Sequence, residues 1–241
     1  MKNASDSYGE HFLKGNTSKA NAILIGCALH VVVQIVDGFF KEPLYRYSEH
    51  AFWIFDFVKF VAIPAVVLLW LYRAFSIAPA SYGLRSRSKT ENWFYFLGLT
   101  LFLAIVLNLV YKGVHHFAWD IVWRIFHPEP APEFYKSLVP DGLLHYPAAI
   151  YFAATAGFAE EVFFRGLPLL YIKERFGNAK PGWKYVVATS VLFASAHWEN
   201  GLHEVIATFA YGVASSLLYL KLRNLWPLIG AHALVDFWNF S

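Results

Sequence analysis

The sequence predicts an all-α membrane protein, a polytopic bundle of about seven transmembrane helices around a polar intramembrane cavity. Three observations lead to this fold class. The 241 residues are 57% hydrophobic and only 15% charged, whereas soluble domains carry about 25% charged residues. The apolar residues are gathered in runs long enough to cross a bilayer. Two carboxylates and a guanidinium interrupt one of these runs, and ionised groups at membrane depth require either partners or a use.

The amino-terminal part of the chain is expected to comprise two regions. Residues 1–19 are polar and lack the pattern of a cleavable signal, so they predict an N-terminal tail. Residues 20–140 predict an N-terminal transmembrane region with three spans and a Pro-rich loop. The three spans are expected at residues 20–36, 51–71 and 93–111.

Two features of this N-terminal region bear on its shape. In the second span, Asp56 and Lys59 lie three positions apart and can pair on one helix face, and Pro64 should kink the helix. After the third span, residues 114–126 are aromatic and amphipathic. This composition is typical of a helix that lies in the membrane interface rather than of a further span.

The remaining residues, 141–241, predict a core of four spans. The first of them carries the charged cluster, and Pro168 within it would clash with the carbonyl of Phe164. The helix should therefore bend just after the cluster. The four spans are expected at residues 143–171, 185–198, 202–222 and 226–240.

The basic residues predict the orientation of the chain. With the amino terminus inside, the inner segments carry thirteen of the twenty Lys and Arg residues and the outer segments five. This bias places the amino terminus in the cytoplasm. The short loops favour a prokaryotic plasma membrane. The basic residues lie at span ends rather than in one patch, which excludes a nucleic-acid partner and leaves the lipid bilayer as the expected surroundings.

Polar residues inside the last four spans fall into three groups, and each group contains a pair of residues four positions apart on one helix face. The groups are Glu160, Glu161 and Arg165, then Phe193 and His197, then His232 and Asp236. Counted from the inner ends of their spans, the key groups lie at a common depth of roughly 15–20 Å. A single polar site within the membrane is therefore expected.

Carboxylates and imidazoles around a hydrated cavity suit the activation of water for attack on a carbonyl. A glutamate in a low-dielectric site can act as a general base near neutral pH. A histidine can share the proton of the water or protonate the leaving amine. Donors on the opposite wall would stabilise the developing oxyanion, typically by about 3–4 kcal/mol.

The three motifs, E-E-x-x-x-R, F-x-x-x-H and H-x-x-x-D, stand in this order on successive apolar segments. Over about residues 140–240 the chain resembles the CAAX protease and bacteriocin-processing family of glutamic-type intramembrane proteases. The resemblance implies a helical bundle around a hydrated cavity and an intramembrane endopeptidase. It makes residues 141–241 the catalytic core. The substrate would be a membrane-associated peptide or protein, such as a prenylated carboxyl-terminal peptide, a leader or a sorting tail.

The resemblance also implies roles for individual residues. Glu160 and His197 would activate the water, and His232 and Asp236 would line the oxyanion side. The last position is most often Asn in this family, and Asp236 can donate a hydrogen bond only when it is protonated. Asp236 would otherwise orient His232. The supporting residues are Glu161, Arg165 and Phe193.

Several alternatives remain open for these residues. No cofactor is expected, but Glu160, His197 and His232 are also a possible zinc site with bound water, although the H-E-x-x-H pattern is absent. The same carboxylates would serve a proton-coupled transporter, and the same fold would serve a non-catalytic scaffold or immunity protein. His203 and Glu204 follow a tight turn and either lie near the site or face outer water, and the second interpretation is preferred.

Overall fold

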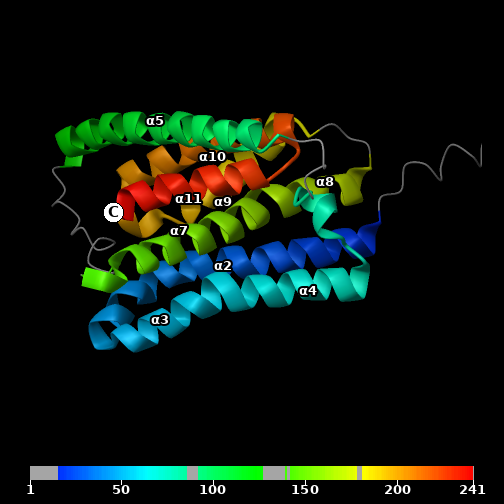
Figure 1. Ribbon diagram of the computed structural model, residues 1–241, viewed down its shortest axis with the longest axis horizontal. Helices are drawn as coiled ribbons and strands as arrows, with labels where there is room; N and C mark the ends of the chain where they lie inside the picture. Colours follow the sequence, from blue (N-terminus) through cyan, green and yellow to red (C-terminus); the bar gives the residue numbers. More distant parts are fainter. Residues whose placement is uncertain (1–15, 86–91, 127–138, 140–141, 178–180, 241) are drawn as a thin grey trace, which may run out of the picture.

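The fold is all-α throughout the part of the chain that the computed structural model describes, residues 16–85, 92–126, 139, 142–177 and 181–240 (Figure 1). In the view of Figure 1, most of the helices run roughly along the long axis. Most of the polar tail predicted at residues 1–19 lies at residues 1–15, and most of the Pro-rich loop lies at 127–138 and 140–141. These residues are outside the described part of the chain.

The first helix, α2 (Thr17–Tyr47), begins at Asn16, whose side chain accepts a hydrogen bond from the backbone nitrogen of Lys19. The expected end of the first span at residue 36 is wrong. Asp37 and Lys41 are both buried and ion-paired inside the bundle, so they continue the helix instead of ending it at the membrane surface.

The second helix is continuous but contains one widened turn. Its segments are α3 (Glu49–Phe57), the π-helical turn η1 (Val58–Ala62) and α4 (Ile63–Phe75). The widened turn immediately precedes the predicted point of disturbance, Pro64, because proline supplies no backbone N–H for the regular helical ladder. Within it, Lys59 lies 3.8 Å from Asp56, as the spacing predicts.

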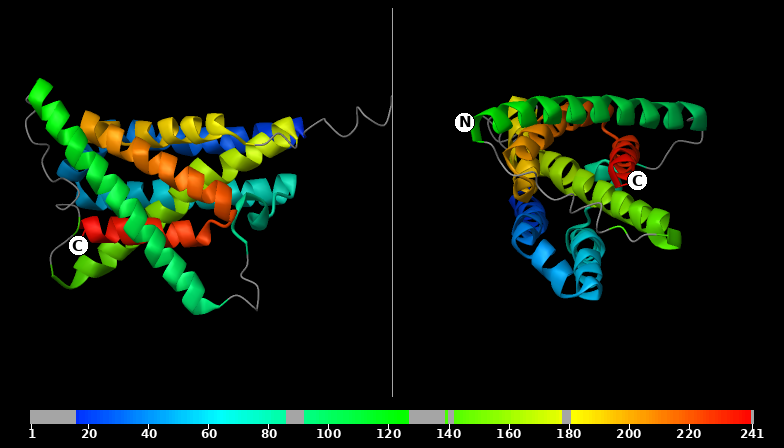
Figure 2. Two further views of the ribbon diagram at one scale, coloured as in Figure 1. Left: turned by 90° about the horizontal axis from the view of Figure 1, so that it is seen from above. Right: turned by 90° about the vertical axis from the view of Figure 1, so that its left-hand side faces the viewer.

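The third helix, α5 (Trp93–Phe126), is a single element. The expectation of a separate interfacial helix at residues 114–126 is therefore wrong. At 1.5 Å per residue α5 is about 50 Å long, well beyond a hydrocarbon core of about 30 Å. It crosses α10 and α11 obliquely (Figure 2), and such a tilt accommodates a helix that is too long to stand upright.

The C-terminal half forms the centre of the bundle. The helix α11 packs on α7 and α5, α10 packs on α9 and α5, and α8 packs on α2. These elements are α7 (His145–Glu161), η4 (Val162–Gly166), α8 (Leu167–Phe176), α9 (Trp183–Ser195), α10 (Leu202–Leu222) and α11 (Trp226–Phe240). Three short 3₁₀ turns complete the described structure: η2 (Pro79–Tyr82), η3 (Gly142–Leu144) and η5 (Trp198–Asn200).

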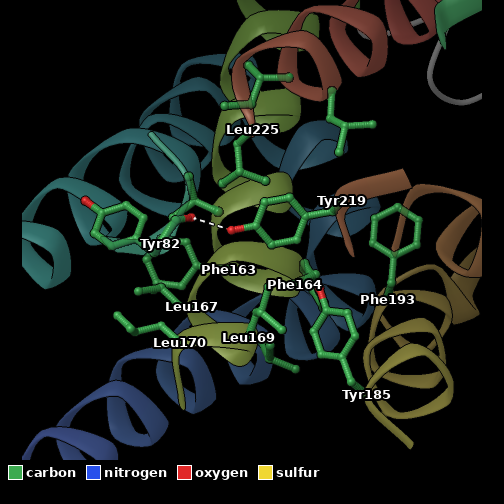
Figure 3. Packing of buried hydrophobic residues seen from close by; sticks show 14 of the residues in the cluster. Tyr82, Phe163, Phe164, Leu167, Leu169, Leu170, Tyr185, Phe193, Tyr219 and Leu225 are labelled. Atoms are coloured by element: carbon green, nitrogen blue, oxygen red, sulfur yellow. Dashed lines mark hydrogen bonds between the residues drawn. The ribbon is translucent and has the colours of Figure 1, made fainter. Parts of the chain in front are cut away.

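The main apolar cluster lies around α8 and the C-terminal half of α10 (Figure 3). The turn η2 is folded onto it, and the hydroxyl of Tyr219 donates to the carbonyl of Tyr82 at 3.0 Å. Gly166 lies against that same carbonyl, so a larger residue there would displace the turn. Gly83, which follows Tyr82 in the chain, has a φ of 101°, and its carbonyl oxygen accepts a hydrogen bond from the backbone nitrogen of Leu225.

Within the residues that the structure describes, four helical stretches are long and apolar enough to cross a membrane: α2, α3 with α4, α5 and α10. Large apolar side chains on the outside, such as Ile54 and Phe94, are 66% and 83% exposed, as lipid-facing residues should be. These features indicate an integral membrane protein. The helices α9 and α11 have 13 and 15 residues, fewer than the about 20 of an ordinary span.

Candidate active site

A cavity of about 320 Å³ lies between the N-terminal helices and the C-terminal core. Its lining includes all four residues that the sequence predicts as catalytic. They come from α7, the turn after α9, and α11. The lining also includes residues of α2, α3 and α5. The four residues are Glu160, His197, His232 and Asp236.

The charged cluster on the fourth predicted span sits at a second π-helical turn. Pro168 follows η4 at the same spacing as Pro64 follows η1. The bend expected just after the charged cluster stays a prediction, and what the structure has next to Pro168 is the π-helical turn that contains Arg165. The carbonyl of Arg165 accepts a hydrogen bond from the hydroxyl of Tyr185 at 3.1 Å. Single π turns within α-helices are frequent at functional sites.

His232 is the residue around which three carboxylates gather. Its Nδ1 lies 2.9 Å from Oε1 of Glu161. Its Nε2 lies 3.5 Å from Oε2 of Glu160 and 3.6 Å from Oδ2 of Asp236. The side chains of His232 and Glu160 are 6% and 7% exposed, so these contacts act where water screens them little. Glu161 fixes the ring, and the second nitrogen faces the other two acids.

Arg165 supplies positive charge behind Glu161. It is fully buried, with Nη1 at 3.4 Å from Oε1 of Glu161, as the four-residue spacing predicts. Nη2 donates to the hydroxyl of Ser215 at 2.7 Å, and the guanidinium lies 4.1 Å from the centre of the Phe193 ring. Glu161 is therefore shared between Arg165 and His232, which leaves Glu160 beside the cavity.

His197 approaches the cavity from another side. The fifth predicted span was expected to continue to residue 198, but α9 ends at Ser195 and His197 lies in the following turn. Nδ1 of His197 lies 2.9 Å from the carbonyl oxygen of Phe193, so this nitrogen donates and Nε2 keeps its lone pair. Across the described residues, no hydrogen bond or ion pair joins His197 to Glu160.

The N-terminal helices contribute charged residues to the cavity that do not belong to any of the three sequence motifs. Lys59 pairs with Asp37, and Lys41 lies 2.6 Å from Glu199 at the start of η5. Burial favours the neutral form of Glu199, but the ammonium of Lys41 outweighs it and holds the pKa of Glu199 below its usual value. Of these residues, sequence reasoning found only the spacing of Lys59 with Asp56.

Glu204 is not in outer water, contrary to expectation. It is 8% exposed and lines the cavity, as does its neighbour His203. The hydroxyl of Tyr111 lies 2.9 Å from both oxygens of the Glu204 carboxylate, and Nε2 of His115 lies 3.5 Å from one of them. The sequence shows no pattern for His115, because its partners lie on a different helix.

The side chains grouped as metal ligands would be are not the three that the sequence offers as a zinc site. Among the described residues, His115, His203 and Glu204 offer ligand atoms that all lie within 4.8 Å of one another. The set Glu160, His197 and His232 does not form such a group there. Nδ1 of His232 is instead occupied by Glu161.

The comparisons with known proteins identify the segment that carries these motifs. Residues 142–238 match a protein-family model described as Type II CAAX prenyl endopeptidase Rce1-like. The matched range contains all three motifs and nearly coincides with the core expected at residues 141–241. The comparison with curated proteins and the comparison with solved structures each found no match.

Proposed function

Because residues 142–238 form a domain of the Rce1-like type II CAAX prenyl endopeptidase family, we propose that the chain is an intramembrane endopeptidase. It hydrolyses a peptide bond of a membrane-associated protein, in a carboxyl-terminal tail or a leader. The observation that supports this best is the buried His232 with three carboxylates around it at the wall of a cavity of about 320 Å³.

The proposed reaction begins with a water molecule in the cavity. Glu160 removes a proton from the water as its oxygen attacks the carbonyl carbon of the substrate. Nε2 of His197, which holds a lone pair, accepts a hydrogen bond from the second O–H of the water and so orients it, and that hydrogen stays on the attacking oxygen. As the C–N bond breaks, the proton on Glu160 passes to the leaving nitrogen. The products are a carboxylic acid and an amine, and Glu160 returns to its starting state.

The oxyanion that forms during attack needs a donor on the other wall. His232 fits this role when both ring nitrogens carry protons, since Nδ1 donates to Glu161 and Nε2 then points toward Glu160 and Asp236. Those carboxylates favour the charged ring. One preorganised donor of this kind is worth about 3–4 kcal/mol in acyl transfer. Asp236 then acts by holding His232, rather than by donating as an Asn would.

The topology belongs to the same proposal. We propose that α7 with α8, α9 and α11 also cross the membrane, giving seven crossings with a cytoplasmic amino terminus in a prokaryotic plasma membrane. The start of α2 and the end of α11 lie at opposite ends of the bundle, as an odd number of crossings requires (Figure 1). Residues 20–140 then act as a region that supplies the opposite wall of the cavity.

The test is a comparison of protein termini in membranes from cells that carry wild type, Glu160→Gln or Glu174→Gln. Glu174 lies on α8, outside the cavity, and controls for the substitution itself. Mass spectrometry should find a set of uncleaved carboxyl-terminal tails or leaders only with Glu160→Gln, although this variant is folded by gel filtration. Identical termini in all three membranes would overturn the proposal and favour a non-catalytic scaffold.

A further inference from the structure

We propose that His115, His203 and Glu204 form a binding site for one transition-metal cation, with Zn²⁺ as the first candidate. The site joins α5 to the first turn of α10. Two of its residues line the same cavity, but none of them is one of the four proposed catalytic residues, and the site does not depend on the proposed function.

The geometry of the three side chains supports such a site. Nε2 of His115 lies 3.5 Å from Oε2 of Glu204, and all the ligand atoms lie within 4.8 Å of one another. Zinc bonds of about 2.0–2.2 Å in a tetrahedral site place neighbouring ligand atoms roughly 3.3–3.5 Å apart. One pair already has this separation, and the His203 ring lies 4.9 Å from the His115 ring by centroids.

The burial of Glu204 is an independent observation that points to a cation. Its side chain is 11% exposed, at a helix end within the bundle. A carboxylate in such a place is costly unless a positive charge compensates it. In the described parts of the chain, the basic group in ion-pair range of Glu204 is His115, which is charged only when protonated. A bound divalent cation would supply the compensation at any pH near neutral.

Tyr111 provides the outer support that metal-ligating carboxylates commonly have. Its hydroxyl lies 2.9 Å from each oxygen of Glu204 and therefore restricts the orientation of the carboxylate. The indole of Trp119 packs edge-on to His203 at 4.7 Å between ring centres and fixes the second imidazole. Two of the three ligands are thus held in place by neighbours on α5.

The ligand types select the class of metal. Two imidazoles and one carboxylate suit zinc and its neighbours in the first transition series, while Mg²⁺ and Ca²⁺ prefer oxygen ligands. Three protein ligands leave one tetrahedral position for water or another oxygen. His203 and Glu204 line the cavity, so that position would face the space that also contains Glu160.

The test measures zinc binding by the full chain in detergent after removal of metal with a chelator. Titration calorimetry with Zn²⁺ alone should give about one site per chain for wild type. His203→Ala and Glu204→Gln each remove a ligand and should weaken binding by more than the about 10–100-fold that loss of a supporting residue causes. Tyr111→Phe should weaken binding within that range.

Two matched variants make the result decisive. His116→Ala removes an exposed histidine adjacent to His115 and should leave zinc affinity unchanged. Glu160→Gln should also leave it unchanged, because Glu160 belongs to the other cluster. Absence of zinc binding by wild type would overturn the proposal. So would a loss with Glu160→Gln, or unchanged affinity in folded Glu204→Gln, which conserves the shape of the side chain.

Discussion

Replacing Arg165 with Met should strongly destabilise the bundle. The guanidinium is fully buried, pairs with a Glu161 side chain that is also 0% exposed, donates to Ser215 and lies over Phe193. Removing one partner of a buried pair leaves the other charge uncompensated, which costs about 3–5 kcal/mol. At about 2–4 °C per kcal/mol for a chain of this length, Tm should fall by about 6–20 °C.

Thermal unfolding in detergent, followed by near-ultraviolet absorption or a thiol-reactive dye, measures this loss. Arg73→Met is the matched control, because Arg73 is exposed in the last turn of α4 and should change stability by no more than about 0.5 kcal/mol. The double variant Glu161→Gln/Arg165→Met should lose less than the sum of the single variants, by about 0.5–3 kcal/mol. Additive losses, or an Arg165→Met protein as stable as the control, would refute the reasoning.

Three further predictions concern the cavity and its walls. The ion pair between Glu199 and Lys41 should contribute about 1.5–3 kcal/mol to the free energy of unfolding. Because folding lowers the pKa of Glu199, this contribution is complete above the pKa of Glu in the unfolded chain, about 4.3, and is lost as the pH falls below it. Glu199→Gln should therefore flatten the acid limb of a plot of Tm against pH. Gly157→Ala should slow cleavage at least tenfold, because the added Cβ would lie 3.1 Å from the backbone of α11 and push His232 away from Glu160. The control is Gly98→Ala, whose added Cβ has no neighbour within 4 Å, and it should cleave at the wild-type rate. Tyr211→Phe should leave Tm nearly unchanged, because its buried hydroxyl has no hydrogen-bond partner in the described structure, and a Tm drop above 4 °C would contradict this.

The candidate site was largely predictable because its contacts follow from spacing along single helices. Arg165 pairs with Glu161 and Asp236 approaches His232, each across one helical turn. The family match over residues 142–238 agrees with the resemblance that these motifs carry. That Nδ1 of His232 binds Glu161 rather than Glu160 depends on how α11 packs on α7, and spacing along one helix cannot give it.

The predicted end of the first span and the predicted interfacial helix are wrong because tertiary contacts override the local sequence pattern. Asp37 in an apolar run predicts the end of a span, because the sequence does not show that Lys59, 22 positions later, neutralises it. Residues 114–126 predict a separate interfacial helix because they are aromatic and amphipathic. One of them, His115, instead faces Glu204 on α10. A charged residue in an apolar run ends a membrane span only when no side chain of opposite charge pairs with it.

The two π-helical turns divide two of the long helices into functionally different halves. The lining of the cavity includes residues of α3, η1 and α7 but none of α4 or α8. Those latter segments contribute Leu71 and Leu167 to the apolar cluster instead. A π-helical turn interrupts the regular hydrogen-bond pattern of the α-helix, so we expect each of these helices to be more easily deformed at that point. We expect amide hydrogen exchange to be faster in α3 and α7 than in α4 and α8, so that a substrate can rearrange the cavity wall while the packed half stays closed.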